Sequence, residues 1–272
     1  MKDFGIDISS HQGNFDFKKA KKEGVKFAII KAGGSDGGFY KDSKFENNYK
    51  NAKAQGLNVG AYYFSSATNE EQAKKEAEYF ISYLKGKQFE LPVYIDVESS
   101  RACKHKKTNK DNLTSAIITF CKTLEKAGYF VGIYANVDYF KNYMNDNKLQ
   151  DYCHWVAQWS TNLTYKCDDG VIGLWQFGGE TNYIRTNKVA GQVCDQDYLL
   201  IDYPSKIKKM GKNGFKKEET ITLEQVAKKV INGEFKNQPL RSVLLLAYIK
   251  KNKLPYTVKQ VQSKVNELLK KK

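Results

Sequence analysis

The sequence has few of the residues that build metal centres or disulfide frameworks. Its three histidines, His11, His105 and His154, are far apart, and it contains no HExxH and no paired CxxC motif. These absences argue against a conventional zinc site, so we expect no metal and no other cofactor. The five cysteines are odd in number and irregularly spaced. This pattern favours reduced thiols, although a pair such as Cys153 and Cys167 could still close.

Long apolar runs are also lacking. No stretch reaches the roughly 18 consecutive apolar residues that a membrane-spanning helix needs, and the first residues, Met1 to Asp7, contain no hydrophobic segment of a signal peptide. We therefore expect neither membrane insertion nor signal-directed secretion. If the protein acts outside the cell, we expect its release by lysis or through the pore of another protein.

Acidic residues are scarce in the last quarter of the chain. Residues 203–272 carry 18 basic and 5 acidic side chains, a balance of +13, whereas residues 1–202 carry 27 and 25. This asymmetry indicates two units with different partners. The basic tail favours an anionic partner, which is a nucleic acid, a membrane surface or an acidic cell-wall polymer. A lysine-rich face that only aids solubility is the alternative.

Eight short runs of β-branched and aromatic residues are typical of strands, and amphipathic stretches that predict helices separate the early ones. Repeated strand–helix–strand units predict parallel strands with right-handed crossovers. Eight such strands in about 200 residues indicate a compact closed barrel with its chemistry at the carboxyl ends of the strands. After Asn136 the helices shorten, so we expect an irregular second half with antiparallel pairs. The predicted strands are 4–9, 25–32, 59–65, 93–98, 130–136, 154–159, 173–177 and 193–200, and the predicted helices are 16–23, 42–55, 69–84 and 112–127.

The sequence after residue 202 consists of two segments that differ in their hydrophobic periodicity. Residues 203–218 lack periodicity and carry proline, glycine and lysines, so we interpret them as a linker. Helical patterning returns at 223–231, 240–249 and 258–269, which predicts a small bundle over 219–272. The expected fold is thus α/β: a compact, irregular TIM-like barrel over 1–202, then a three-helix bundle.

The most informative local feature is the run from Val93 to Glu98, an apolar strand that carries Asp96 and Glu98. Residues i and i+2 lie on one face of a strand, about 6.5–7 Å apart. Two neighbouring carboxylates raise the proton affinity of one, which can then act as an acid near neutral pH. Glycosidic bond cleavage uses this arrangement. The alternative is a capping Asp and a solvated Glu at a strand end.

Further acids and aromatic rings occupy comparable places. Asp7 and Asp195 lie within the first and last predicted strands, and closure of the barrel would bring both to one cavity. Four aromatic residues lie in or at the end of strand runs, where core packing is the alternative to stacking on sugars. They are Tyr62, Tyr134, Trp159 and Trp175.

One motif favours a different chemistry. Gly33–Gly37 matches the GxSxG pattern of serine hydrolases and follows a strand. A nucleophile elbow also needs a helix directly after Ser35, but the sequence continues as a loop. Of the two downstream histidines, only His154 has surroundings that suit a triad base, and it begins a strand instead of lying on a loop. A serine hydrolase is therefore disfavoured, and so is a nucleotide enzyme, because no phosphate-binding glycine motif occurs.

In this order, the segments resemble those of the family 25 glycoside hydrolases, the lysozyme-type muramidases common in phage lysins. The resemblance covers about residues 3–202. Its segments are Gly5–Ser9 with Gln12-Gly13, Phe27–Lys31, Gly60–Phe64, Asp96–Glu98, Gly132–Tyr134, Ala157–Trp159, Leu174–Phe177 and Asp195. One departure is the stretch Ala32–Gly37, where the family often has Ala-Thr-Glu-Gly.

The resemblance implies hydrolysis of the β-1,4 bond from N-acetylmuramic acid to N-acetylglucosamine in the peptidoglycan of Gram-positive walls. It implies an endolysin made in the cytoplasm of a bacterial host and released to the wall. Glu98 matches the proton donor, Asp96 the acid that stabilises or orients the reacting centre, and Asp7 and Asp195 the acids that line the site. The matching glycan-binding residues are Tyr62, Tyr134, Trp159, Trp175 and Lys31.

The tail resembles the small three-helix wall-binding repeat of some phage lysins, with Arg241 at a matching position. This implies that residues 219–272 bind bacterial cell wall, with anionic wall polymers as further partners. Two other classes of function remain open: a non-catalytic wall-binding protein, and a nucleic-acid binder led by the basic tail. The tail has no obvious recognition helix, so we expect no nucleic-acid partner.

Overall fold

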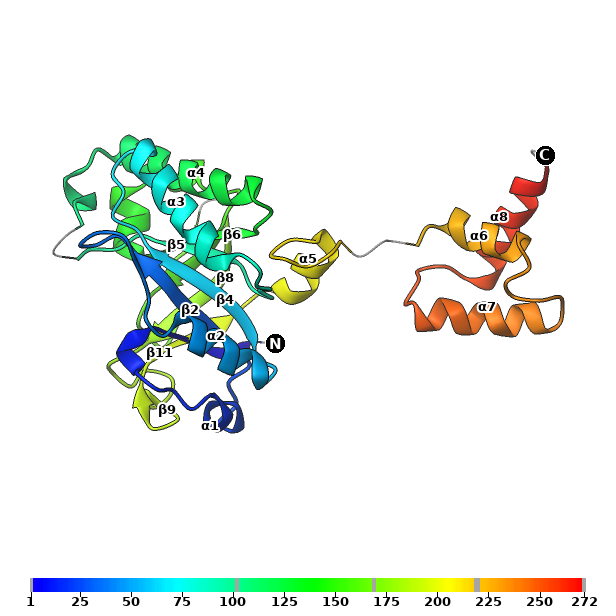
Figure 1. Ribbon diagram of the computed structural model, residues 1–272, viewed down its shortest axis with the longest axis horizontal. Coiled ribbons are helices and arrows are strands. Elements are labelled where there is room, and N and C mark those ends of the chain that lie inside the picture. The colour runs from blue at the N-terminus through cyan, green and yellow to red at the C-terminus, as the bar shows by residue number, and fades with distance from the viewer. Residues whose placement is uncertain (1, 101–102, 168–169, 218–220, 271–272) are drawn as a thin grey trace. The chain divides into compact units, whose positions relative to one another are not determined.

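The computed structural model of the chain describes residues 2–100, 103–167, 170–217 and 221–270 (Figure 1). The chain forms two compact units, Met1–Lys217 and Glu218–Lys272. Among the described residues, no helix combines the length and the apolar composition that a membrane crossing requires.

The first unit is built around a closed barrel of eight strands. β1 pairs with β2 on one side and with β11 on the other, which closes the sheet. Neighbouring strands from β1 to β8 are parallel, whereas β11 is antiparallel to both β8 and β1. The barrel strands are β1 (Asp3–Ile8), β2 (Phe27–Gly34), β4 (Asn58–Phe64), β5 (Val93–Asp96), β6 (Val131–Asn136), β7 (Cys153–Ala157), β8 (Val171–Gly178) and β11 (Asp195–Leu199). The predicted compact barrel with an irregular second half is confirmed.

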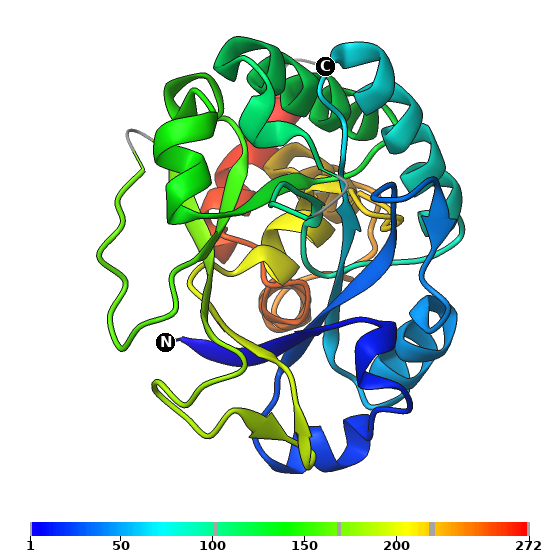
Figure 2. The ribbon, with the colours of Figure 1, turned by 90° about the vertical axis from the view of Figure 1, so that its left-hand side faces the viewer.

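Helices lie around the outside of the strands (Figure 2). They are α1 (Phe17–Lys22), α2 (Phe45–Ala54), α3 (Glu70–Leu84) and α4 (Lys110–Lys126). In α3, Asn69 accepts a hydrogen bond from the backbone of Gln72, and the buried face repeats at Ala73, Ala77 and Phe80. Between β6 and β7 the chain forms only short helical turns, at Tyr139–Tyr143 and Asp146–Lys148. The remaining strands among the described residues are the short β3 (Tyr40–Lys41), β9 (Lys188–Val189) and β10 (Gln192–Val193).

Aromatic rings fill the barrel interior. Tyr94 and Trp155 are buried and pack edge to face, with ring centroids 5.1 Å apart. Their size requires glycine on the neighbouring strand: a Cβ at Gly132 would lie 2.4 Å from the Tyr94 ring. The Tyr94 hydroxyl also contacts the Cys153 thiol at 3.8 Å. No disulfide bond joins Cys153 to Cys167, or any other pair of the described cysteines.

The segment 203–218 is not simply a linker, as the sequence had led us to expect. It begins with α5 (Tyr203–Met210), whose buried Tyr203 and Ile207 pack into the barrel interior. Further on, the buried Asn213 donates hydrogen bonds to the carbonyls of Phe89 and Leu91 at 3.2 and 2.8 Å. These contacts lie at the amino ends of the strands, so the segment closes that end of the barrel.

The described part of the second unit, residues 221–270, contains three helices, at the predicted places. They are α6 (Leu223–Ile231), α7 (Leu240–Lys251) and α8 (Val258–Lys270). Each contributes to one small apolar core, through residues such as Val226, Leu245 and Val261. Arg241 lies at the start of α7, where its guanidinium donates to the carbonyl of Lys236 at 3.2 Å.

Candidate active site

The four predicted acids meet at the open end of the barrel. Asp7, Glu98 and Asp195 line one pocket of about 300 Å³, together with Lys31 and other side chains. Asp7 and Asp195 face each other in the β1–β11 ladder. Asp96 ends β5 and is only 2% exposed. Parallel strands bring their carboxyl ends to one rim, and the antiparallel β11 brings its first residue there, which is why these distant residues converge.

Glu98 has the protonation behaviour of a general acid. Burial raises its pKa to about 7, the positive charge of Lys31 opposes this rise, and the negative charges of Asp195 and Asp36 add to it. The sequence had led us to expect Asp96 as the raising charge. The repulsion between the two carboxyl groups is mutual: burial raises the pKa of Asp96 well above its usual value, and the negative charge of Glu98 raises it further. A carboxyl group with a pKa near 7 holds a proton that it can transfer at neutral pH.

Asp96 is buried with an open hydrogen-bonding position. Its Oδ1 atom has no hydrogen-bond partner among the residues that the structure describes. A buried carboxylate oxygen without a donor costs stability. The arrangement is therefore typical of a group that receives its donor from a bound ligand.

Asp7 and Asp197 form a further pair of buried acids. Burial raises the pKa of Asp7 well above its usual value, and the charges of Asp195 and Asp197 raise it further. Asp197 is fully buried and accepts a hydrogen bond from Trp155 Nε1 at 2.7 Å. Burial also raises the pKa of Asp197 well above its usual value, and the charge of Asp195 raises it further, whereas the hydrogen bond from Trp155 lowers it. The two buried carboxyl groups therefore titrate as a coupled pair, and both hold their protons to higher pH than a free carboxyl group does.

Gln176 on β8 connects the acids to the aromatic residues. Its Nε2 donates to Asp7 Oδ2 at 2.9 Å. Its Oε1 accepts from the Tyr134 hydroxyl at 3.0 Å and from Trp159 Nε1 at 2.9 Å. One amide therefore fixes a carboxylate and two rings, which gives the site a defined shape before any ligand binds.

The sequence pattern of the family described as "Glycosyl hydrolases family 25" matches residues 6–184 of this chain. The chain belongs to glycosyl hydrolase family 25. It is 30% identical over 158 residues to an autolytic lysozyme from Clostridium acetobutylicum, a match that covers 58% of this chain and 45% of that protein. This chain thus spans less than half the length of that relative.

Solved structures of related proteins have the same fold. The CTP1L endolysin superposes with a TM-score of 0.63 at 26% identity, over 76% of this chain and 70% of the other. A family 25 glycosyl hydrolase from Bacillus anthracis superposes with a TM-score of 0.59 at 26% identity, over 73% and 88% of the two chains.

Three of the four predicted aromatic residues lie at the site of this family 25 protein. Tyr62 lines the pocket, Tyr134 is buried on Gln176, and Trp159 is 38% exposed at the rim. The prediction for Trp175 is wrong. Its ring is 2% exposed on the outer face of β8, and its Nε1 donates to the carbonyl of Gln158 at 2.8 Å. Side chains alternate along a strand, so the inward position belongs to Gln176.

Lys31, the remaining predicted glycan-binding residue, lines the pocket, and its ammonium lies 4.7 Å from the centre of the Phe64 ring. Asp36, which sequence reasoning did not select as a site residue, lines the same pocket and accepts from the Tyr40 hydroxyl at 2.8 Å. The serine-hydrolase alternative has no support in this geometry. Ser35 Oγ donates to Glu76 at 2.5 Å, whereas the buried His154 pairs with Asp146 at 3.2 Å.

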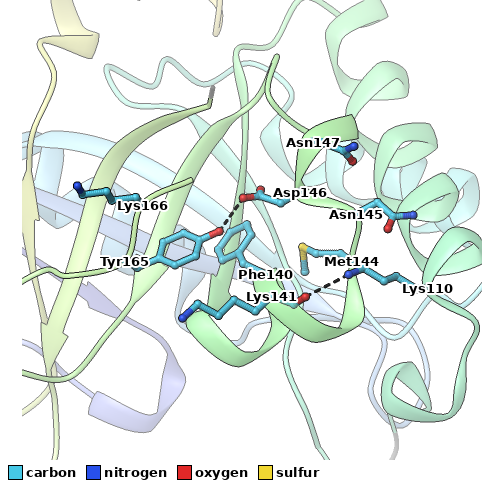
Figure 3. Close-up of a pocket in the computed structure, with 9 residues that line it drawn as sticks. All are labelled: Lys110, Phe140, Lys141, Met144, Asn145, Asp146, Asn147, Tyr165 and Lys166. Atoms are coloured by element: carbon cyan, nitrogen blue, oxygen red, sulfur yellow. Dashed lines mark hydrogen bonds between the residues drawn. The ribbon is translucent and has the colours of Figure 1, made fainter. Parts of the chain in front are cut away.

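A larger pocket, of about 440 Å³, lies beside the turns that follow β6 (Figure 3). Its lining includes Lys110, Lys141 and Lys166, and the Tyr165 hydroxyl donates to Asp146 at 2.6 Å. None of the predicted acids or glycan-binding residues lines it. Size alone therefore does not identify the site; the converging carboxyl groups do.

Proposed function

We propose that this chain is a muramidase that hydrolyses the β-1,4 bond from N-acetylmuramic acid to N-acetylglucosamine in bacterial peptidoglycan. The observation that carries the proposal is a glutamic acid with a pKa of about 7, Glu98, in a pocket lined by further carboxyl groups. Membership of family 25 supports the same reaction class.

In this mechanism Glu98 donates its proton to the glycosidic oxygen while the bond from that oxygen to the anomeric carbon breaks. Positive charge develops on the sugar ring, and the carboxylates at the rim stabilise it. Water then adds to the anomeric carbon, and Glu98 accepts a proton from it, which restores the enzyme.

Asp96 acts on the other side of the reaction. Its buried Oδ1 has no donor among the described residues, and the N–H of a 2-acetamido group supplies one. We propose that Asp96 orients this group so that its carbonyl oxygen attacks the anomeric carbon, giving an oxazolinium intermediate. Direct attack by Asp96 is the alternative. A substrate without the acetamido group distinguishes them, because only direct attack tolerates its loss.

Loss of the proton donor tests the proposal. Glu98→Gln should abolish release of reducing sugars from purified peptidoglycan while the melting temperature changes little. Glu71→Gln, at an exposed glutamate of α3, is the matched control and should keep full activity. Mass spectrometry of the wild-type products should find muramic acid at the reducing ends. Products with new amino groups and no reducing muramic acid would contradict the proposal and indicate an amidase or peptidase.

We propose that the second unit binds the wall and that Arg241 contributes to this binding. The supporting observation is the basic charge of this unit, 12 basic against 5 acidic side chains over 218–272. Deletion of residues 218–272 should weaken pelleting with cell walls more at low salt than at high salt, since salt screens charge attraction. Equal loss at both salt concentrations would argue for specific glycan contacts instead. We also propose that the protein is an endolysin, made in the cytoplasm of a bacterial host and acting on Gram-positive walls.

A further inference from the structure

A second pocket opens on the rim next to the catalytic pocket, between the loop after β2 and α3. It has a volume of about 300 Å³ and is lined by Ser35, Gly38, Phe39, Ser66, Thr68, Gln72, Glu76 and Lys104. The two pockets share a wall: Ser35 lines the second pocket and the next residue, Asp36, lines the catalytic one. A polymer held against Glu98 can therefore continue into this second pocket.

A buried carboxylate fixes the shape of the second pocket. Glu76 lies on the inner face of α3 and is 2% exposed. Its Oε1 accepts from the Ser66 backbone at 3.1 Å and from Ser35 Oγ, while its Oε2 accepts from Ser65 Oγ at 2.5 Å. The Ser65 backbone in turn donates to the carbonyl of Asp96 at 3.0 Å. The pocket is thus tied to the strand end that carries the catalytic acids, and it is preorganised.

An exposed pair of aromatic rings stands at the edge of this pocket. Phe39 is 47% exposed and Tyr79 is 44% exposed, and their rings stack with centroids 4.3 Å apart. Gly37 and Gly38, with φ of +130° and +113°, form the turn that leads to Phe39, a backbone that other residues rarely adopt. A flat apolar face beside hydroxyl and amide groups is the usual environment of a bound sugar ring.

We propose that this pocket is an additional saccharide subsite, which binds a ring of the glycan strand beyond the ring held against Glu98. Phe39 provides the stacking face, and Ser66, Thr68 and Gln72 provide hydrogen-bonding groups. Lys104 adds a positive charge, so the ring that fits carries a carboxylate, as a muramic acid ring without a stem peptide does. This inference rests on the proposed muramidase function.

Substrate length provides the test, with the full chain as the enzyme. Phe39→Ala should raise KM about tenfold, or about 1.4 kcal/mol, for a peptidoglycan octasaccharide, with kcat and the kinetics on a tetrasaccharide unchanged. Met210→Ala, at an equally exposed apolar residue of α5, is the matched control and should change neither. Lys104→Ala should remove any preference for the octasaccharide with free carboxylates over its amidated form.

The outcomes separate this inference from the proposed function. If the wild-type chain cleaves neither oligosaccharide nor peptidoglycan, the muramidase proposal fails. If it cleaves both but Phe39→Ala affects the two oligosaccharides equally, or affects neither, the additional subsite is refuted while the muramidase proposal stands. The melting temperature of Phe39→Ala should fall only slightly, because the ring is half exposed and its stacking contact is with Tyr79 at the surface.

Discussion

Burial raises the pKa of Glu98, and opposing charges of its neighbours adjust it. Removal of either charge should therefore move the alkaline limb of the pH–activity profile in a known direction. Glu98 must be protonated to act as an acid, so activity falls as the pH rises through its pKa of about 7. Asp195 raises this pKa and Lys31 lowers it. Asp195→Asn should therefore move the alkaline limb to lower pH, and Lys31→Gln should move it to higher pH.

The size of the pocket gives the expected magnitude of the shift in the alkaline limb. Treated as a sphere, a pocket of about 300 Å³ is roughly 8 Å across, and at that distance two unit charges interact with about 2 kcal/mol at an effective dielectric constant of about 20 and about 0.5 kcal/mol in water. Since about 1.4 kcal/mol corresponds to one pH unit, each substitution should move the limb by about 0.4 to 1.5 in pH. Asp195, with a pKa of about 6, is ionised where Glu98 titrates.

The assay is kcat/KM on a soluble glycan as a function of pH, because this ratio reports the ionisation of the free enzyme. Glu71→Gln, which removes an exposed charge of α3, is the control and should leave the limb in place. Movement of both site variants in the same direction, or of neither, would show that Glu98 does not set the limb and would refute the assignment of the acid.

Three further predictions concern stability. Asp96→Asn should abolish activity and raise the melting temperature at pH 7 but not near pH 4. The raised pKa of this buried carboxyl group makes its ionised form unfavourable in the folded state, and this cost appears as the pH rises above the pKa of Asp96 in the unfolded chain. Gly132→Ala should lower the free energy of unfolding in urea by about 2 kcal/mol or more, because its Cβ would lie 2.4 Å from the Tyr94 ring. Truncation after residue 217 should leave the barrel's melting temperature unchanged, whereas truncation after residue 202 removes the buried Tyr203 and Ile207 and should cost about 3–6 kcal/mol.

The barrel was predictable because its strands are covered on both faces. Their near-continuous apolar runs have no counterpart in the loops, and caps such as Asn69 fix the helix starts. α5 was missed because a short helix that closes one end of a barrel needs few inward side chains. Tyr203 and Ile207 alone face the interior, among lysines that resemble a linker.

The acids of the site were predictable from their positions inside apolar strands, but their partners were not all identified. Asp197 follows Asp195 by two residues, so the reasoning applied to Asp96 and Glu98 would have found it. The mistaken selection of Trp175, where Gln176 is the residue that faces the site, has a different cause. Alternation defines two faces of β8, and only the neighbouring strands determine which face is inward. The contacts of Glu76 join segments far apart in the sequence, which no local pattern reports.

Because β11 runs antiparallel to its neighbours, its two ends affect different parts of the barrel when the sequence around them changes. Its first residue reaches the rim, so insertions in the preceding loop alter the substrate groove. Its last residue lies at the opposite end, where α5 closes the barrel. Sequence appended beyond that closure is joined to the barrel at the end opposite the carboxyl groups, so the strands that carry them need no change when a carboxyl-terminal module is exchanged.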